Sequence, residues 1–447
     1  MSTTLGDVDN DGYDDIVYQA EQRLLIAVRI KSSTGFLLTT PEVIWVHFDP
    51  AGLLYKHTWG TDRPAIADFD GDGLNEVAAV LGPDASSPTG NLRLALIEHG
   101  AGPMHPTLGA PTPVFGSEID LDTMVSGWTW HTYNHHQGFN FNVQASKVIG
   151  GGLPPEVFVH ETEGGRIGLA LYWRIPGTLW SWYARNTTGA ATHFIHSEDV
   201  NGDGHDDLLN NGVIDVWNGC EFDFNTIPYL TNRTGNHNHA DSVRPYDRDG
   251  DGVKELFVVH DGYDCLISNP GLNCQSSLIW ENVRKNDATE AVFHGQQAII
   301  GNLVNGADSF GFNGDHIVTA PKGPPLYFAG SVVLNGNAQE LTIANNGASS
   351  SPVGPRGGLF SFMDWNGGPT KEVLSFSHNR YSVWKLVFDG TDPNLPYVWG
   401  EVFGHPAQSG PGTIGGFSAT NKDIYGGSRE DIVIFGRYGM QIVSPCP

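Results

Sequence analysis

A short acidic pattern occurs four times along this chain and constrains its fold more than any other feature of the sequence. Each copy has oxygen-bearing side chains at positions 1, 3, 5 and 9 and a glycine at position 6. This spacing provides the ligands that a hard divalent cation such as calcium requires from a tight loop. In chain order the copies are loop 1 (Asp7, Asp9, Asp11, Asp15), loop 2 (Asp68, Asp70, Asp72, Glu76), loop 3 (Asp199, Asn201, Asp203, Asp207) and loop 4 (Asp247, Asp249, Asp251, Glu255). We expect all four to bind calcium as a structural ion.

Each acidic loop is followed by a short apolar run with the composition of a β-strand. These runs cover residues 15–18, 76–80, 207–209 and 255–259, and further strands are expected at 24–30 and 42–47. Each unit is therefore predicted to be a meander of about four strands, which is the structure of one propeller blade.

Degenerate copies of the unit keep the strand but have lost the loop ligands. They lie at 150–159, 302–318, 363–374 and 421–434. Together with the four acidic loops they predict an all-β fold, a single β-propeller of about eight blades. Seven blades is the alternative, because the last unit lacks an outer strand. Residues 1–447 are expected to form one domain, with a long functional insertion at about 85–142.

Charge and cysteine content limit the partners and the compartment. The net charge of −26 repels polyanions, so we expect no nucleic-acid binding, and the absence of a long apolar run argues against a membrane span. Cys265 and Cys274 flank a short loop and are candidates for a disulfide, although free thiols are an alternative. Such a disulfide and the calcium loops favour a secreted, periplasmic or extracellular protein, expected to be a monomer. No leader precedes loop 1, which suggests a mature or trimmed form.

Histidines gather shortly before the acidic loops or their degenerate copies. In a propeller the corresponding point of each blade faces the same central region, so repetition is expected to bring these side chains together. The candidate catalytic residues are His193, His237, His131, His136 and Tyr133. The candidate substrate-binding residues are Arg63, Arg244, His239, His294, His135, Trp59 and Trp128.

This set of side chains suits β-elimination from a uronic acid. Arginine neutralises the substrate carboxylate, a neutral imidazole removes the proton at C5, and a tyrosine or histidine acid assists departure at C4. Tryptophan faces can stack on sugar rings. Two alternatives remain open at this point: any one histidine is structural, or His193, His196, His237 and His239 bind a transition metal such as zinc.

The order of these pieces resembles a known family. The segment from about 155 to 303 presents a histidine, an acidic loop and a strand twice in succession, around His193 and His237, followed by the approach to His294. It is similar to calcium-binding FG-GAP-type β-propeller polysaccharide lyases, namely rhamnogalacturonan lyases and ulvan lyases. The resemblance implies a calcium-stabilised propeller that cleaves acidic polysaccharides by β-elimination.

Two positions depart from the rhamnogalacturonan lyase pattern. His239 stands where those enzymes tend to have an aspartate, and His294 where they tend to have an arginine. The resemblance therefore implies a site closer to the ulvan lyases, in which a histidine base and a tyrosine acid act without catalytic calcium.

Two other functions fit the same fold. A non-catalytic carbohydrate-binding or adhesion propeller, of the lectin or integrin kind, would repeat one shallow site per blade, whereas the histidine-bearing segments here differ from blade to blade. A hydrolase would need a spaced pair of carboxylates outside the metal loops, and the sequence nominates none.

Overall fold

The computed structural model describes most of the N-terminal half and separate strands of the C-terminal half. The described residues are 3–20, 24–48, 52–54, 64–83, 93–124, 141–161, 166–186, 196–210, 213–223, 240–246, 255–260, 276–282, 287–292, 297–301, 316–320, 331–333, 340–341, 359–368, 370–377, 380–388, 397–406, 416–424, 429–436 and 439–445. The chain divides into two compact units, one of Met1–Asp199 with Gly204–Thr226 and the other of Val200–Asp203 with Ile227–Pro447.

Among its described residues, the first unit contains four antiparallel sheets and one short helix, α1 (Leu121–Met124). The first sheet is β1 (Thr3–Gly6), β2 (Asp15–Ala20), β3 (Leu24–Lys31) and β4 (Leu37–Phe48). The second is β5 (Gly52–Leu54), β6 (Ala65–Ala67), β7 (Glu76–Pro83), β8 (Arg93–Met104) and β9 (Pro111–Asp120), with β5 and β6 both pairing with β7. The third is β10 (Phe141–Ser146), β11 (Glu156–Glu161), β12 (Arg166–Ile175) and β13 (Thr178–Asn186), and the fourth is β14 (His196–Glu198), β15 (Asp207–Asn210), β16 (Val213–Trp217) and β17 (Phe222–Asp223).

The second unit also contains four sheets among its described residues. They are β18 (Ala240–Tyr246), β19 (Glu255–His260), β20 (Ser276–Asn282) and β21 (Asp287–Val292); β22 (Gln297–Gly301), β23 (His316–Ala320), β24 (Ser331–Val333) and β25 (Glu340–Leu341); β26 (Leu359–Met363), β27 (Glu372–Ser377), β28 (Arg380–Phe388) and β29 (Tyr397–Pro406); and β30 (Gly416–Lys422), β31 (Asp431–Gly436) and β32 (Gly439–Val443).

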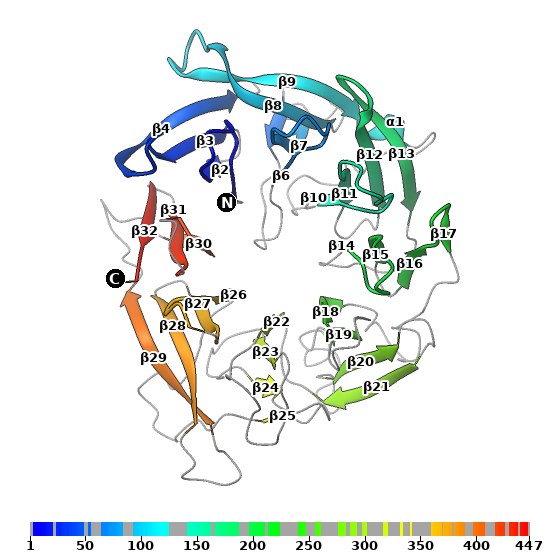
Figure 1. Cartoon of the computed structure of the whole chain (residues 1–447), viewed down its shortest axis with the longest axis vertical. Coiled ribbons are helices and arrows are strands. Elements are labelled where there is room, and N and C mark those ends of the chain that lie inside the picture. The colour runs from blue at the N-terminus through cyan, green and yellow to red at the C-terminus, as the bar shows by residue number, and fades with distance from the viewer. Residues whose placement is uncertain are drawn as a thin grey trace. The chain divides into compact units, whose positions relative to one another are not determined.

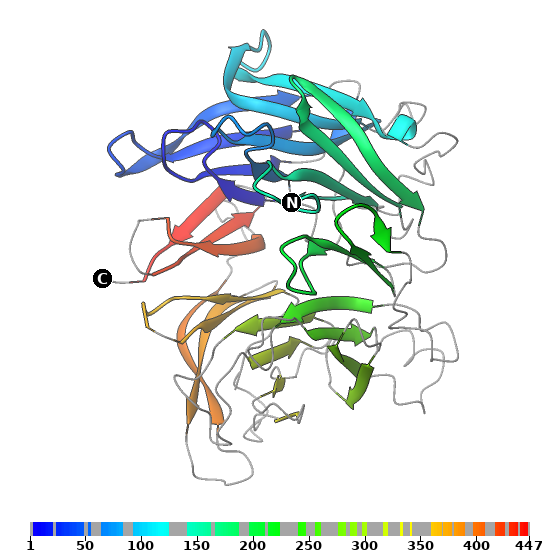
Figure 2. The same cartoon turned by 45° about the vertical axis from the view of Figure 1, so that its right-hand side comes forward.

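Within each unit, the strands of a sheet form an antiparallel meander in chain order, except that β5 pairs with β7. Successive sheets of a unit lie side by side (Figures 1 and 2). The first unit brings β1, β6, β10 and β14 into successive contact, and the second unit does the same with β18, β22, β26 and β30. Meanders placed side by side through such strands form a β-propeller arrangement.

The second sheet of the first unit is buried on both faces at β8. Residues 94–97 of β8 are all inaccessible to solvent, although side chains alternate between the two faces of a strand. Leu94 and Leu96 pack toward Val157 of the third sheet, whereas Ala95 and Ile97 pack toward Trp45 of the first sheet. The hydrophobic core therefore lies between neighbouring sheets, and it fixes the sheets in order.

The strands predicted after the acidic loops are confirmed as β2, β7, β15 and β19, and those at 24–30 and 42–47 as β3 and part of β4. The last sheet has three strands among the described residues, as expected. The eight-blade count stays a prediction, as does a single domain over 1–447. No helix in the described part of the chain has the length and apolar character needed to cross a bilayer.

The expected insertion at 85–142 needs a correction. Residues 93–120 within it form β8 and β9, the outer strands of the second sheet, and are not an irregular loop. Gly100 and Gly109, with φ of 84° and 63°, lie at a register shift of β8 and in the β8–β9 turn. In the described part of this segment, Gly100 and Gly109 therefore belong to a bulged hairpin.

Candidate functional site

The described acidic loops share one backbone geometry. Loops 1, 2 and 3 connect β1 to β2, β6 to β7 and β14 to β15. In each loop the glycine at position 6 has a left-handed φ, 88° at Gly12, 91° at Gly73 and 87° at Gly204. The amide of that glycine donates to the position 1 carboxylate, over 2.9 Å to Asp7, 2.9 Å to Asp68 and 2.8 Å to Asp199. Glycine is thus required at position 6 by the backbone itself.

In loops 1 and 2 the carboxylates converge as cation ligands would. Ligand oxygens of Asp7, Asp9 and Asp15 lie within 4.8 Å of one another, and so do those of Asp68, Asp70 and Glu76. Asp15 and Glu76 are fully buried. Burial raises the pKa of each to about 8, and neighbouring carboxylates add to the effect. In the described part of the chain, Asp15 Oδ1 and Glu76 Oε1 have no hydrogen-bond partner. A divalent cation would satisfy these oxygens, so the residues fit one.

Loop 3 has the same backbone with one neutral ligand. Asn201 Oδ1 accepts a hydrogen bond from the amide of Asp203 at 3.0 Å, and Asp207 is fully buried at the start of β15. In loop 4, Glu255 begins β19, whereas Asp247, Asp249 and Asp251 lie outside the described residues.

The carboxylate at position 9 has a second role that the sequence analysis missed. It accepts a hydrogen bond from the backbone amide at position 2, the residue that follows the first ligand. This bond links Asp15 to Val8 (2.9 Å), Glu76 to Phe69 (2.7 Å), Glu372 to Trp365 (3.0 Å) and Asp431 to Ile424 (2.7 Å), and with one extra residue in the loop Glu156 to Val148 (2.8 Å). The bond therefore occurs in intact and degenerate loops alike.

The prediction that degenerate units have lost all their ligands is accordingly wrong for three of them. Glu156, Glu372 and Asp431 retain the position 9 carboxylate, and each is at most 2% exposed. The signal was present in the sequence: an acidic residue follows an apolar residue by seven or eight positions and begins an apolar strand.

In three of the described loops, the residue at position 8 is bonded to the preceding loop. The amide of Asp206 donates to the Lys147 carbonyl (3.1 Å), and the Asp206 carboxylate accepts from the Lys147 amide (2.7 Å). Glu430 makes the same pair of bonds with Asp364, at 2.6 and 2.7 Å. Asn75 instead donates its side-chain amide to the carbonyl of Asp7 at 2.9 Å. The loops thus join neighbouring sheets within each unit.

Loop 1 contains an internal cation. Arg29, on β3, is ion-paired with Asp9, and its Nε lies 3.2 Å from Asp11 Oδ2. These carboxylates are at positions 3 and 5, where a bound calcium would need them. Arg29 therefore compensates the loop charge and must move for a cation to enter.

The predicted catalytic and substrate-binding residues lie, with the exception of Arg244, outside the described part of the chain. Arg244 lies on β18, but its side chain is not among those described. The residues outside the described part of the chain are His193, His237, His131, His136, Tyr133, Arg63, His239, His294, His135, Trp59 and Trp128. Their convergence stays a prediction, as does the pairing of Cys265 with Cys274, also outside the described residues.

Comparison with known proteins identifies the fold. No protein-family model and no curated protein sequence matches the chain. Solved structures do match it. The exotype rhamnogalacturonan lyase YesX has a TM-score of 0.61 at 13% identity, covering 99% of this chain and 71% of that one. A rhamnogalacturonan lyase from Bacillus licheniformis has a TM-score of 0.58 at 16% identity, with the same coverage. The V. cholerae biofilm matrix protein Bap1 has a TM-score of 0.52 at 12% identity, covering 100% of this chain and 87% of that one. At such identities the likeness shows a shared fold.

Proposed function

We propose that this protein is a secreted polysaccharide lyase that cleaves a uronic-acid-containing polysaccharide by β-elimination. One observation carries the proposal: the fold matches two rhamnogalacturonan lyases over 99% of this chain. The ordered histidines and acidic loops of the sequence, which resemble the same family, add to it. The substrate is an acidic glycan of the ulvan or rhamnogalacturonan kind, and the protein acts as a monomer with no nucleic-acid or membrane partner.

In this proposal the chemistry resides in residues ahead of the loops. One of His193, His237, His131 and His136 removes the proton at C5. Tyr133 or a histidine protonates the leaving oxygen, since a base and an acid must act on opposite ends of the broken bond. Arg63 or Arg244 neutralises the uronate carboxylate, which acidifies the C5 proton. His135, His239, His294, Trp59 and Trp128 bind the sugar.

Calcium in the acidic loops is the structural part of the proposal. Loops 1 to 4 would hold the ion through their carboxylate and amide oxygens, as hard cations prefer. The bonds at positions 8 and 9 connect each loop to its own strand and to the neighbouring sheet. The loops then stabilise an eight-bladed propeller and take no part in the reaction.

The test is a substrate panel of ulvan, rhamnogalacturonan, alginate and glycosaminoglycans, monitored by absorbance of the unsaturated uronate product. We expect a rise on at least one glycan and a loss of roughly 100-fold or more when the catalytic base is replaced, which is the usual contribution of a general base. His193→Ala, His237→Ala, His131→Ala and His136→Ala identify the base. Activity that survives all four would refute the site, and no product from any glycan would refute the lyase.

A second function is favoured by the likeness to Bap1, which covers 87% of that matrix protein. A non-catalytic carbohydrate-binding or adhesion propeller would have the same fold. Its migration would be slowed in a polysaccharide affinity gel, and it would release no unsaturated product. Binding without cleavage across the whole panel would select this function over the lyase.

A further inference from the structure

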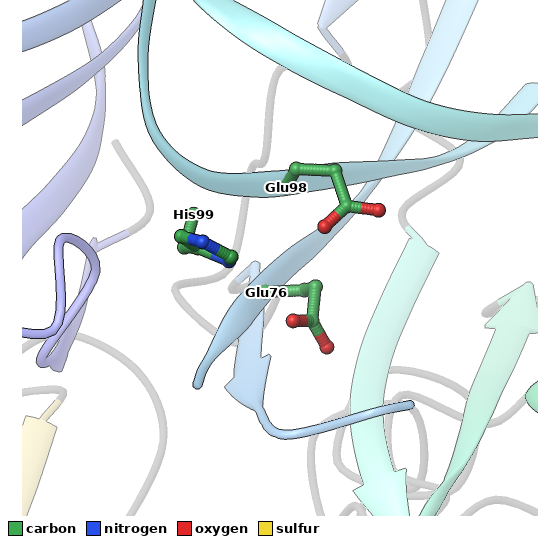
Figure 3. A group of neighbouring side chains, drawn as sticks. All are labelled: Glu76, Glu98 and His99. Atoms are coloured by element: carbon green, nitrogen blue, oxygen red, sulfur yellow. The ribbon is translucent and has the colours of Figure 1, made fainter. Parts of the chain in front are cut away.

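A group of metal-ligating side chains lies beside loop 2, on the second sheet. Glu76 begins β7, and Glu98 and His99 belong to the neighbouring strand β8 (Figure 3). The β7–β8 ladder pairs Val77 with Ile97, so the next step of the ladder sets Glu76 opposite Glu98. Like charges directly across a pair of strands destabilise it unless a cation lies between them.

A β-bulge allows His99 to join the two carboxylates. Consecutive side chains of a regular strand point to opposite faces, so Glu98 and His99 would ordinarily be separated. The β8–β9 register shifts between Glu98 and Ala101, and Gly100 has a φ of 84°. Bulges re-aim side chains in this way. As a result, one ligand atom from each of Glu76, Glu98 and His99 lies within 4.8 Å of the others.

Two buried polar atoms of this group lack partners among the described residues. Glu76 is fully buried; its Oε2 accepts from the Phe69 amide, and its Oε1 has no partner. His99 Nδ1 is also buried without a hydrogen bond. Buried polar atoms are almost always satisfied in folded proteins. A cation in loop 2 would already satisfy Glu76 Oε1, so it is the buried His99 Nδ1 that indicates a further ligand.

Glu98 is held in position by groups outside the cluster. The hydroxyl of Tyr172, from β12 of the third sheet, donates to Glu98 Oε1. Gly116 on β9 leaves the room for this bond, because a Cβ there would lie 2.4 Å from Glu98 Oε1 and 2.6 Å from the tyrosine oxygen. The bond occupies one carboxylate oxygen and leaves the other for a metal. Hydrogen bonds of this kind commonly orient metal ligands.

We propose that Glu76, Glu98 and His99 form a second metal site, which takes a divalent transition-metal ion such as zinc. Two carboxylate oxygens and an imidazole nitrogen are ligands for such an ion, whereas calcium takes oxygen ligands. Glu76 is then shared with the calcium site of loop 2. The three ligands come from β7 and β8, and Tyr172 of β12 holds Glu98 in place. The site stands whether or not the protein is a lyase.

The experiment counts zinc bound to the full-length protein. The chain is stripped of metal with a chelator, saturated with calcium, dialysed against zinc and analysed for zinc per chain. His99→Ala and Glu98→Gln each remove one ligand, and Glu98→Gln keeps an acceptor for Tyr172. His105→Ala is the matched control: His105 lies in the β8–β9 turn, where its Nδ1 accepts from the amides of Thr107 and Leu108.

We expect His99→Ala and Glu98→Gln each to lose about one zinc per chain at a fixed free zinc concentration, and His105→Ala to lose none. Zinc bound by other histidines is the same in wild type and variant, so it does not contribute to the difference in zinc per chain. Equal zinc in wild type and a folded His99→Ala protein, judged by its circular dichroism, would overturn the proposal. If His99→Ala does not fold, equal zinc in wild type and Glu98→Gln decides against it. Displacement of this zinc by excess calcium would overturn the metal class, because it would mark an oxygen-preferring site.

Discussion

At the scale of single residues, the carboxylate at position 9 is present even in degenerate loops that lack other cation ligands. In the degenerate loop before β27, Glu372 accepts from the Trp365 amide and, through its other oxygen, from Asn366 Nδ2 at 2.6 Å. The asparagine amide thus satisfies the oxygen that would face a cation in an intact loop. Lys371 Nζ, 3.6 Å from Asp364, supplies positive charge nearby. A degenerate loop replaces the ion with donors from its own side chains.

Replacing Glu372 tests this role. Glu372→Ala leaves the buried Trp365 amide without its acceptor, so we expect a loss of about 1–3 kcal/mol in the free energy of unfolding. The loss should be the same with calcium and with chelator, because no ion is involved. Urea unfolding measures both. Glu221→Ala, at an exposed position, is the control, expected within about 0.5 kcal/mol of wild type. A calcium-dependent loss at Glu372 would contradict this role.

Glu156 gives the protein a pH-dependent stability that is independent of metal. Burial raises its pKa from 4.5 to about 7, against the effect of the Ile149 and Val148 amides. The folded state therefore holds a proton that the unfolded state releases, and stability falls as pH rises from about 4.5 to about 7. A shift of this size corresponds to a change on the order of 3 kcal/mol.

Glu156→Gln removes the titrating group and should flatten this part of the stability profile. The measurement is the free energy of unfolding across that pH range, in chelator, for both proteins. The difference between the variant and wild type should move in favour of the variant as pH rises. A difference that stays constant with pH would show that Glu156 is ionised throughout.

At the scale of the loop element, the acidic loops are not equivalent. Arg29 of β3 pairs with Asp9 and Asp11 of loop 1. In loop 2, Asp70 accepts from the amide of Asp72, and Asp72 accepts from the amide of Leu74, as Asp11 of loop 1 does from the amide of Tyr13. Loop 1 therefore carries its own counter-charge in the metal-free state, and a cation must compete with it.

Arg29→Gln should raise the calcium affinity of loop 1 and lower the stability of the same loop without calcium. Loss of a partly exposed ion pair of about 1 kcal/mol corresponds to roughly a fivefold gain in calcium affinity, since about 1.4 kcal/mol is a factor of ten. Calorimetric calcium titration of the two proteins measures it. Arg93→Gln, which breaks a pair with Glu118 away from any loop, is the control. Unchanged affinity in Arg29→Gln would mean that the arginine does not compete with the ion.

At the scale of the whole molecule, the described sheets depend on their neighbours. Hydrophobic clusters lie between successive sheets, and the position 8 bonds join successive loops. An ion bound in one loop would therefore also fix contacts of the adjoining sheet. Stabilising a loop should therefore also stabilise the hydrophobic core between the two sheets that it joins.

Removal of calcium should consequently lower the thermal midpoint. A ligand that binds the folded state alone adds about 2.7 kcal/mol per site at a hundredfold excess over its Kd. Scanning calorimetry with chelator, with calcium and with calcium restored after chelation is the measurement. Recovery on restoring calcium separates binding from irreversible damage. A midpoint unaffected by chelation would mean that the loops are stable without an ion.

The acidic loops and the strands that follow them were predictable because each lies in one contiguous segment. The glycine at position 6, the carboxylate at position 1 and the strand after position 9 are local features, and local backbone geometry follows from local sequence. The candidate catalytic residues were proposed on the weaker ground that equivalent points of repeated units converge. They lie outside the described residues, so that convergence stays a prediction.

By itself, the sequence determined the repeat, the loop geometry and the all-β class, since these depend on residues a few positions apart. Only the tertiary structure decided that Arg29 enters loop 1 and that Glu98 and His99 reach Glu76. Those contacts depend on which strand pairs with which and in what register, and a shift of one residue sends a side chain to the opposite face. The bulge at Gly100 makes such a change, and its effect on His99 depends on pairing with β9, which the sequence of β8 alone does not specify.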